Sequence, residues 1–289
     1  MRLLFLGTGA AQGYPAVFCR CDSCEAARER GGRSIRRRSA ALVNDDLLLD
    51  FGPDLIAASR DYRLSLHRVQ YLLLTHSHHD HLHVENFDQH RPRWAILDIP
   101  TLHVYASAAT LDAIRAYPWP LEDMRVELHS VAPGQTWEMG PYRATALRAR
   151  HNERQAPLFY AVEANPTTAA GAAIEHSQSA LLYATDTGPF YPEAWGVLDT
   201  LRALGVRFGA TVIEGTFGLR ETPPEGDHMN LARCAEHHRL LRERGLTTPS
   251  CIQLATHCSP NGSPLHEETD AYLSPHGVRA AYDGLTIDF

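Results

Sequence analysis

The densest cluster of chemically active side chains in the sequence is the segment 75–81, which reads THSHHDH. It follows a run of apolar residues that is typical of a buried strand. In an extended chain alternate side chains share a face, so His76 and His78 can bind the same ion. If the chain then turns, Asp80 and His81 can bind a second ion close by. Imidazole nitrogens combined with carboxylate oxygens favour zinc, manganese or iron over calcium or magnesium.

Other polar residues follow apolar strand candidates further along the chain. They are His151, Asp186, Glu214 and His257. Sheets of α/β proteins place their sites where strands end, because the following loops meet there. The sequence therefore predicts that one edge of the sheet forms an active-site rim together with the histidine-rich segment.

A framework of alternating strands and helices must position these side chains. The apolar runs predict strands at 2–6, 40–43, 47–50, 69–74, 102–105, 144–147, 159–162, 180–184, 211–213 and 252–255. The helical patterns predict helices at 25–30, 54–60, 109–116, 194–204 and 231–244. This alternation indicates an α/β fold. Because no fixed-period repeat or long linker divides the chain, we expect a single domain over residues 1–289, with a flexible loop at 167–173.

The composition is that of an ordinary globular protein with an unusual amount of histidine. Of 289 residues, 44% are hydrophobic, and 27 Lys+Arg against 34 Asp+Glu give a net charge of -7. These values exclude collagen-like, disordered and membrane-embedded classes, and the acidic balance argues against a general nucleic-acid coat. The 17 histidines suggest metal chemistry where they cluster. The sequence shows neither a signal peptide nor a membrane-length apolar run, so we expect a cytoplasmic protein with no membrane partner.

Taken in order, these motifs resemble those of the metallo-β-lactamase superfamily. The segment 47–52, LLLDFG, resembles its first motif, whose aspartate, here Asp50, supports the metal loop from behind. The segment 76–81 matches its second motif. The later motif positions match His151, Asp186 and His257. The resemblance implies a four-layer αββα sandwich with a two-metal site at its edge.

The resemblance also implies how two divalent ions would be held. One ion lies on His76, His78 and His151, a second lies on Asp80, His81 and His257, and Asp186 lies between them. Zinc or manganese suits such a site, and iron is compatible with it. Two cations that share a carboxylate and a water lower the pKa of the water, giving a hydroxide that can attack phosphorus or a carbonyl carbon. Asp80 is accordingly expected to be catalytic as well as a ligand.

A second candidate metal site comes from three thiols near the N-terminus, Cys19, Cys21 and Cys24, in the segment 19–24. In a reducing compartment their C-x-C-x2-C spacing indicates a structural zinc rather than disulfides, and free cysteines are the alternative. This stretch resembles the PhnP-like phosphodiesterase branch of the superfamily and also the PqqB-like proteins. In the PhnP-like pattern a histidine completes the zinc site, but this chain has Pro260 at that position. The remaining candidates for a fourth ligand are Cys258, His266 and a water.

A histidine outside the ligand set is the candidate general acid. His228 follows Asp227 in the segment GDHMN, between two strand candidates. In phosphodiesterase branches a histidine at this place contacts the substrate phosphate, and an imidazole can protonate a poor leaving group near neutral pH. The alternative is a histidine at a helix N-terminus that Asp227 caps.

Two further groups are expected to face solvent. The arginine run Arg33, Arg36, Arg37 and Arg38 is interpreted as a solvated face in preference to a phosphate-binding patch. The pair His237 and His238 lies in the middle of a predicted helix and is interpreted as surface.

The leading hypothesis is a dinuclear, metal-dependent phosphodiesterase that hydrolyses a small phosphodiester of the ribosyl cyclic phosphate type, with His228 protonating the leaving oxygen. One alternative is another hydrolase of the same fold, acting on a thioester, lactone or ester. A second is a PqqB-like accessory or oxygen-using role in cofactor biosynthesis, which the complete ligand set disfavours. The expected partner is a small-molecule phosphodiester and no long nucleic acid, and the sequence is compatible with a homodimer.

Overall fold

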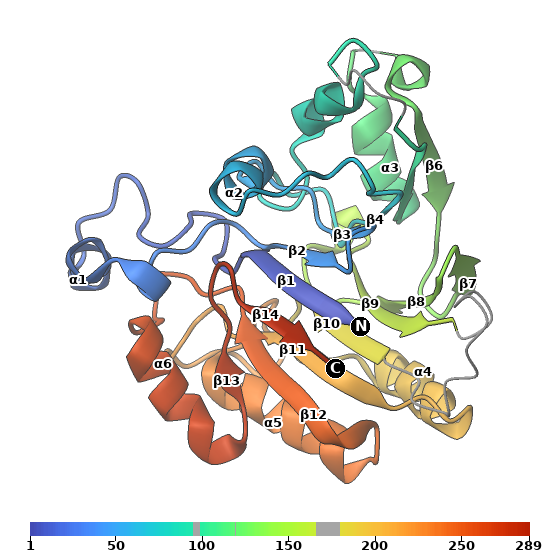
Figure 1. The fold of residues 1–289 in the computed structure, drawn as a ribbon. Helices are drawn as coiled ribbons and strands as arrows, with labels where there is room; N and C mark the ends of the chain where they lie inside the picture. Colours follow the sequence, from blue (N-terminus) through green and yellow to red (C-terminus); the bar gives the residue numbers. More distant parts are fainter. Residues whose placement is uncertain (95–98, 119, 166–179) are drawn as a thin grey trace.

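Two seven-stranded sheets pack face to face in a computed structural model that describes residues 1–94, 99–118, 120–165 and 180–289 (Figure 1). The first sheet has the order β14-β1-β2-β3-β4-β5-β6. Its strands are β1 (Arg2–Gly7), β2 (Ala40–Val43), β3 (Leu47–Leu49), β4 (Tyr71–Leu73), β5 (Leu102–Ala106), β6 (Val126–Ser130) and β14 (Thr286–Asp288). The second sheet has the order β13-β12-β11-β10-β9-β8-β7. Its strands are β7 (Thr136–Met139), β8 (Tyr142–Arg148), β9 (Leu158–Ala164), β10 (Ala180–Ala184), β11 (Phe208–Glu214), β12 (Thr247–Thr256) and β13 (Arg279–Ala280).

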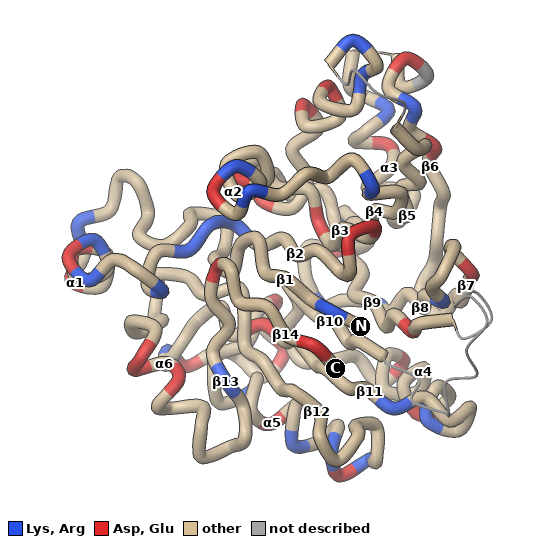
Figure 2. The backbone as a smooth tube through the Cα atoms, viewed as in Figure 1, with Lys and Arg blue, Asp and Glu red and all other residues tan. Residues whose placement is uncertain are grey.

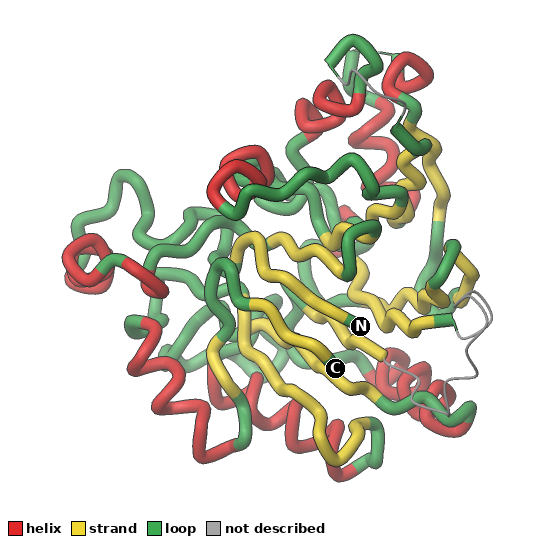
Figure 3. Tube along the Cα trace, in the orientation of Figure 1, coloured by secondary structure: helices red, strands yellow, loops and turns green. Residues whose placement is uncertain are grey.

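Helices cover the outer faces of both sheets, so the predicted four-layer αββα sandwich is confirmed (Figure 3). The α-helices are α1 (Asp22–Arg30), α2 (Leu55–Asp61), α3 (Ala108–Arg115), α4 (Pro192–Ala203), α5 (Leu231–Glu243) and α6 (His266–Leu273). The short 3-10 helices are η1 (Gly32–Ser34), η2 (Val84–His90), η3 (Leu121–Met124), η4 (Glu153–Gln155) and η5 (Ser274–His276). None of the described helices combines the length and the apolar character needed to cross a membrane.

The layers follow from how the strand side chains alternate. In β10, Leu181 and Tyr183 point into the core between the two sheets, whereas Leu182 and Ala184 point into the core beneath α4 and α5. Both faces of this strand are therefore buried, which explains why its sequence is a continuous apolar run rather than an alternating one. Burying each leucine side chain contributes about 1.5–3 kcal/mol.

Parallel pairing brings the strand ends that carry polar residues to one edge. β3, β4, β5 and β6 run parallel in the first sheet, and β10, β11 and β12 run parallel in the second. Two hydrogen bonds join the sheets at this edge: Leu158 N donates to Thr75 O at 2.8 Å, and the Tyr160 hydroxyl donates to Leu74 O at 2.6 Å. The loops after β4, β10, β11 and β12 therefore meet, as the sequence predicted.

Several strands and one helix were not predicted. The strands β6, β7, β13 and β14 are short and lie at sheet edges, and α6 follows a loop with no capping side chain. β14 forms because it pairs with β1 at the other end of the chain, with Arg2 opposite Asp288. A local sequence pattern does not indicate pairing between segments that are distant in the sequence. The predicted flexible loop at 167–173 lies outside the described residues.

The surface interpretation of the His237 and His238 pair is wrong, since their exposed fractions are 4% and 0%. α5 turns this part of its surface toward the second sheet. His237 Nε2 accepts a hydrogen bond from Phe190 N at 3.2 Å. His238 lies 3.0 Å from the Thr211 hydroxyl through Nδ1. Both rings are satisfied core histidines.

The solvated-face interpretation of the arginine run is also wrong for most of its members. Figure 2 shows basic and acidic positions interspersed over the outer loops and helices of the described chain. Arg36, however, is buried and donates to the Thr8 hydroxyl at 2.9 Å and to Ala281 O at 2.6 Å. Arg38 forms a two-point ion pair with Asp54. These arginines bind the segment before β2 to the rest of the molecule, because a buried guanidinium needs several acceptors.

Candidate metal centre

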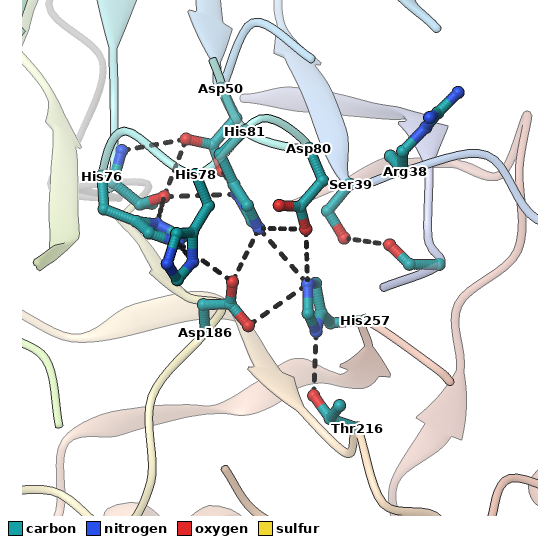
Figure 4. Close-up of polar contacts among 12 residues, drawn as sticks. Arg38, Ser39, Asp50, His76, His78, Asp80, His81, Asp186, Thr216 and His257 are labelled. Carbon is teal, nitrogen blue, oxygen red and sulfur yellow. Dashed lines mark hydrogen bonds and ion pairs between the residues drawn. The ribbon is translucent and has the colours of Figure 1, made fainter. Parts of the chain in front are cut away.

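The histidine-rich segment leaves β4 and lies against the residues that follow β10 and β12 (Figure 4). The structure brings all seven predicted ligands together, in two groups that share Asp186. Within each group the donor atoms lie within 4.8 Å of one another. The first group is His76, His78, His151 and Asp186, and the second is Asp80, His81, Asp186 and His257. This division is the one that the resemblance implied.

The first group is held by close contacts between imidazole nitrogens. His78 Nδ1 lies 2.8 Å from His76 Nε2 and 3.0 Å from His151 Nε2. His76 Nε2 also lies 3.2 Å from Asp186 Oδ2. Ligands of a tetrahedral zinc ion are separated by about 3.3 Å, given zinc–nitrogen distances of about 2.0–2.1 Å. The observed spacings therefore match a ligand set that surrounds one ion.

The second group contains carboxylate oxygens that lack donors. His81 Nε2 lies 2.9 Å from Asp186 Oδ2 and 3.3 Å from Asp80 Oδ2. Asp80 Oδ2 and Asp186 Oδ1 are buried and accept no hydrogen bond within the described chain. A buried carboxylate oxygen without a donor is costly unless a cation compensates it. The residues present therefore fit a pair of divalent ions.

The electrostatics of the cluster keep Asp186 ionised and His76 neutral. Burial alone would raise the pKa of Asp186, but His257 and His81 outweigh burial and hold its pKa well below the usual value. Burial, together with His81, lowers the pKa of His76 to about 3. Ionised carboxylates and neutral imidazoles are the forms that bind metals.

Left-handed backbone conformations aim three side chains over the strand ends. Asp50, Asp186 and His257 have φ values of 63°, 47° and 58°. Aspartate, asparagine and histidine tolerate this region better than other residues with a side chain, but it still costs on the order of 1–3 kcal/mol. Such strain concentrates at functional sites, where the surrounding structure enforces it.

Asp50 lies behind the metal loop. Its Oδ2 is 2.7 Å from His81 Nδ1, and its Oδ1 accepts from the Thr75 backbone and hydroxyl, both at 2.9 Å. His81 Nε2 is thereby left facing Asp186. A carboxylate in this position fixes the tautomer and the orientation of a ligating imidazole.

Replacing Asp50 by asparagine is expected to weaken metal affinity about 10- to 100-fold, because His81 loses its charged partner. Asparagine tolerates the left-handed backbone at this position, so the fold is kept. A zinc titration against a competing chelator measures the change. The exposed Asp45 provides the matched control Asp45→Asn, and equal affinities for the two variants would contradict the role of Asp50.

His228 lies beside both groups and has a carboxylate behind it. Its Nδ1 is 2.9 Å from Glu214 Oε1 and 3.3 Å from Asp186 Oδ1. The fully buried Glu214 also accepts from three backbone N–H groups, those of Thr187, Thr216 and Met229. Burial would lower the pKa of His228, but the surrounding carboxylates, Glu214 foremost, raise it to about 10.

The structure contradicts the alternative interpretation of His228, in which Asp227 caps the helix. The helix α5 begins at Leu231 and is capped by the side chain of Asn230, so Asp227 is not the cap. Glu214 holds Nδ1 and leaves Nε2 available to a substrate. Glu214 was predicted at the rim without a role, and its position directly after the predicted strand 211–213 was the available signal. In the structure it is the last residue of β11.

Comparison with known proteins identifies the family. A family model described as "Beta-lactamase superfamily domain" matches residues 46–248, which span the histidine-rich segment and Asp186. The protein belongs to the β-lactamase superfamily. Its two packed sheets with helices outside are the superfamily fold that the motifs predicted.

Two solved structures share this superfamily fold along the whole chain. A crystal structure described as a new diphosphatase from the PhnP family has a TM-score of 0.72 and 19% identity, covering 100% of this chain and 97% of the other. Zinc-bound PqqB from Methylobacterium extorquens has a TM-score of 0.70 and 18% identity, covering 100% of both chains. Similarity at these identities shows a common fold alone.

A curated relative is longer than this chain. It is an octanoyltransferase from Porphyromonas gingivalis, 25% identical over 297 residues, which cover 99% of this chain and 51% of the relative. The chain therefore spans about half the length of the curated relative that it matches.

The cysteine loop of this superfamily member gathers the three predicted thiols. The sulfurs of Cys19, Cys21 and Cys24 lie within 4.8 Å of one another just before and within α1. His266, a candidate for the fourth ligand, instead places Nδ1 3.3 Å from the Arg36 guanidinium. The positive charge of this guanidinium disfavours a divalent cation at the His266 ring. The structural zinc stays a prediction.

Proposed function

We propose that the protein is a dinuclear, metal-dependent phosphodiesterase that acts on a small, cyclic phosphodiester of the ribosyl type. The observation that carries the proposal is the pair of donor groups that share Asp186, with His228 beside them. A carboxylate common to two groups is what a two-ion site needs, and an imidazole next to it serves a reaction with a poor leaving group.

The residues divide into those that hold ions and those that handle the substrate. Two divalent ions bound to these groups would activate a water and neutralise charge that develops on a phosphoryl group. Asp80 and Asp186 would supply the anionic ligands, and Asp50 would hold the ring of His81 in place. His228 would donate a proton from Nε2 to the leaving oxygen while Glu214 holds its Nδ1.

Three features support a phosphoryl substrate over an acyl one. The segment around His228 and the cysteine loop resemble those of PhnP-like phosphodiesterases. A structure with the same fold is described as a diphosphatase from that family. The Glu214 carboxylate behind His228 suits proton donation to an alkoxide, which cleavage of a ribosyl cyclic phosphate releases.

Metal removal and reloading tests this function. Stripped protein is expected to hydrolyse bis(p-nitrophenyl) phosphate at no more than about 1% of the rate of protein reloaded with manganese, zinc or iron, because the ions carry the electrostatic catalysis. Magnesium and calcium should restore little, since imidazole ligands suit them poorly. Ribosyl 1,2- and 2′,3′-cyclic phosphates are then tested as substrates of the reloaded protein. Full loading without phosphodiester turnover would reject the proposal.

A second candidate function is hydrolysis of an acyl thioester or ester. The observation in its favour is the name of the curated relative, an octanoyltransferase that is twice as long as this chain. The two candidates separate in one assay series, in which the reloaded protein is offered octanoyl thioesters beside the phosphodiesters. Turnover of the thioester alone would favour the acyl substrate.

A further inference from the structure

A cluster of two histidines and a glutamate lies on the first sheet, outside the candidate metal centre. β5 and β6 pair in parallel with His103 opposite Glu127 and Tyr105 opposite His129. Side chains two residues apart on a strand share a face, so all four lie on the same side of the sheet. This side faces the second sheet, because Tyr105 packs against the core between the sheets.

The donor atoms of this cluster converge on a point that solvent can reach. His103 Nδ1 lies 3.1 Å from His129 Nε2 and 3.3 Å from Glu127 Oε2, and the three donor atoms lie within 4.8 Å of one another. These two distances are close to the ligand separation of about 3.3 Å around a tetrahedral zinc ion. The side chains of His103 and Glu127 are 32% and 60% exposed.

The protonation of the cluster leaves one contact without a hydrogen. His103 Nδ1 carries at most one proton, which can be directed to Glu127 or to His129 but not fully to both. If His129 donates to His103 instead, the contact between His103 and Glu127 joins two lone pairs. A divalent ion resolves this conflict, since it accepts electron pairs from all three atoms.

Aromatic neighbours hold both imidazole rings in place. The ring of Tyr71 stacks on His103 at 6.0 Å between centroids, and the ring of Tyr105 stacks on His129 at 4.6 Å. Tyr105 in turn stacks on Trp137 of β7, at 5.4 Å, so the second sheet supports the site. Rings held by packing lose little conformational entropy when they bind an ion, which favours a preorganised site.

We propose that His103, Glu127 and His129 form a further zinc site that joins β5 to the edge strand β6. Three protein ligands with one position open to solvent are the ligand set of an accessible zinc site. Bound zinc would link the last two strands of the first sheet and stabilise its edge. The site is independent of the proposed hydrolysis, because none of its ligands belongs to the two groups that share Asp186.

Equilibrium dialysis over a series of buffered free zinc concentrations, with bound zinc counted by mass spectrometry, tests the proposal. Wild-type protein is expected to bind one more equivalent than His129→Ala or His103→Ala. Glu127→Gln keeps the side-chain shape at an exposed position, and its additional zinc equivalent should bind only at higher free zinc concentrations. The exposed His276 provides the control His276→Ala, which should bind as the wild type does.

Phosphodiester hydrolysis measured on the same samples separates this site from the candidate metal centre. Loss of one zinc equivalent with hydrolysis retained is the expected result for His129→Ala. Equal zinc content in wild type, His129→Ala and Glu127→Gln at every free zinc concentration would overturn the proposal. A loss in His276→Ala as large as that in His129→Ala would also overturn it, because binding would then be spread over surface histidines.

Discussion

Asp186→Asn is expected to lower kcat/KM for phosphodiester hydrolysis by at least about 1000-fold and to reduce the number of bound ions. The Asp186 carboxylate is the part of the site that belongs to both donor groups. Its Oδ2 lies 3.2 Å from His76 Nε2, and its Oδ1 lies 3.3 Å from His257 Nε2. Removing its charge therefore affects both proposed ions at once, whereas loss of any single histidine affects one.

Asparagine is the informative replacement because of the backbone at this position. Asp186 has a φ of 47°, which asparagine tolerates and alanine does not, so the variant changes charge without adding strain. The matched control is Asp199→Asn, on the outer helix α4, where Asp199 pairs with Arg244 at 2.8 Å. Metal content and kcat/KM are measured for both variants and the wild type. A fully active Asp186→Asn, or equal losses in the two variants, would contradict a shared ligand.

The parts of the fold that could be predicted are those with a strong local signal. β10 spans Ala180–Ala184 as predicted, since a strand buried on both faces is apolar throughout. The rim of polar residues after β4, β10, β11 and β12 could be predicted because parallel strands end at one edge. The two-ion division came from the family resemblance rather than from spacing, and the structure gathers those residues in the same groups.

What could not be predicted depends on partners that are distant in the sequence. Arg36 is buried because Thr8 and Ala281 supply acceptors, and the second of these lies 245 residues away. A run of arginines carries no local sign of such acceptors. The left-handed backbone at Asp50 and Asp186 is equally a product of the assembled site.

His238 is a different case, since the sequence did contain its signal. The buried residues of α5 include Leu231, Cys234, Ala235, His238 and Leu241. Their spacing follows the apolar stripe of an amphipathic helix, with the histidine in register. Periodicity is a better guide than polarity at this position, because His238 has buried hydrogen-bond partners in Thr211 and Leu254.

His228→Ala is expected to slow hydrolysis of phosphodiesters with alkyl leaving groups by about 100- to 10,000-fold, the range of a lost general acid. Bis(p-nitrophenyl) phosphate should lose less than about tenfold, because its leaving group departs without a proton. The structural basis is that Glu214 binds His228 Nδ1 at 2.9 Å and leaves Nε2 for the substrate. The measurement is kcat/KM for a series of phosphodiesters that differ in the pKa of the leaving group.

Glu214→Gln distinguishes a proton donor from a residue that only shapes the site. Glutamine has one carbonyl oxygen, so it can accept either from Thr187 N, which now donates to Oε1, or from Met229 N, which now donates to Oε2, and it no longer holds a positive charge on His228. The loss of kcat/KM in Glu214→Gln should therefore be smaller than the loss in His228→Ala. It should likewise be greater for poor leaving groups than for good ones. Equal losses for good and poor leaving groups in both variants would show that the pair positions substrate instead. A greater loss of kcat/KM for poor leaving groups than for good ones in both variants would assign His228 as the acid and Glu214 as its positioning residue.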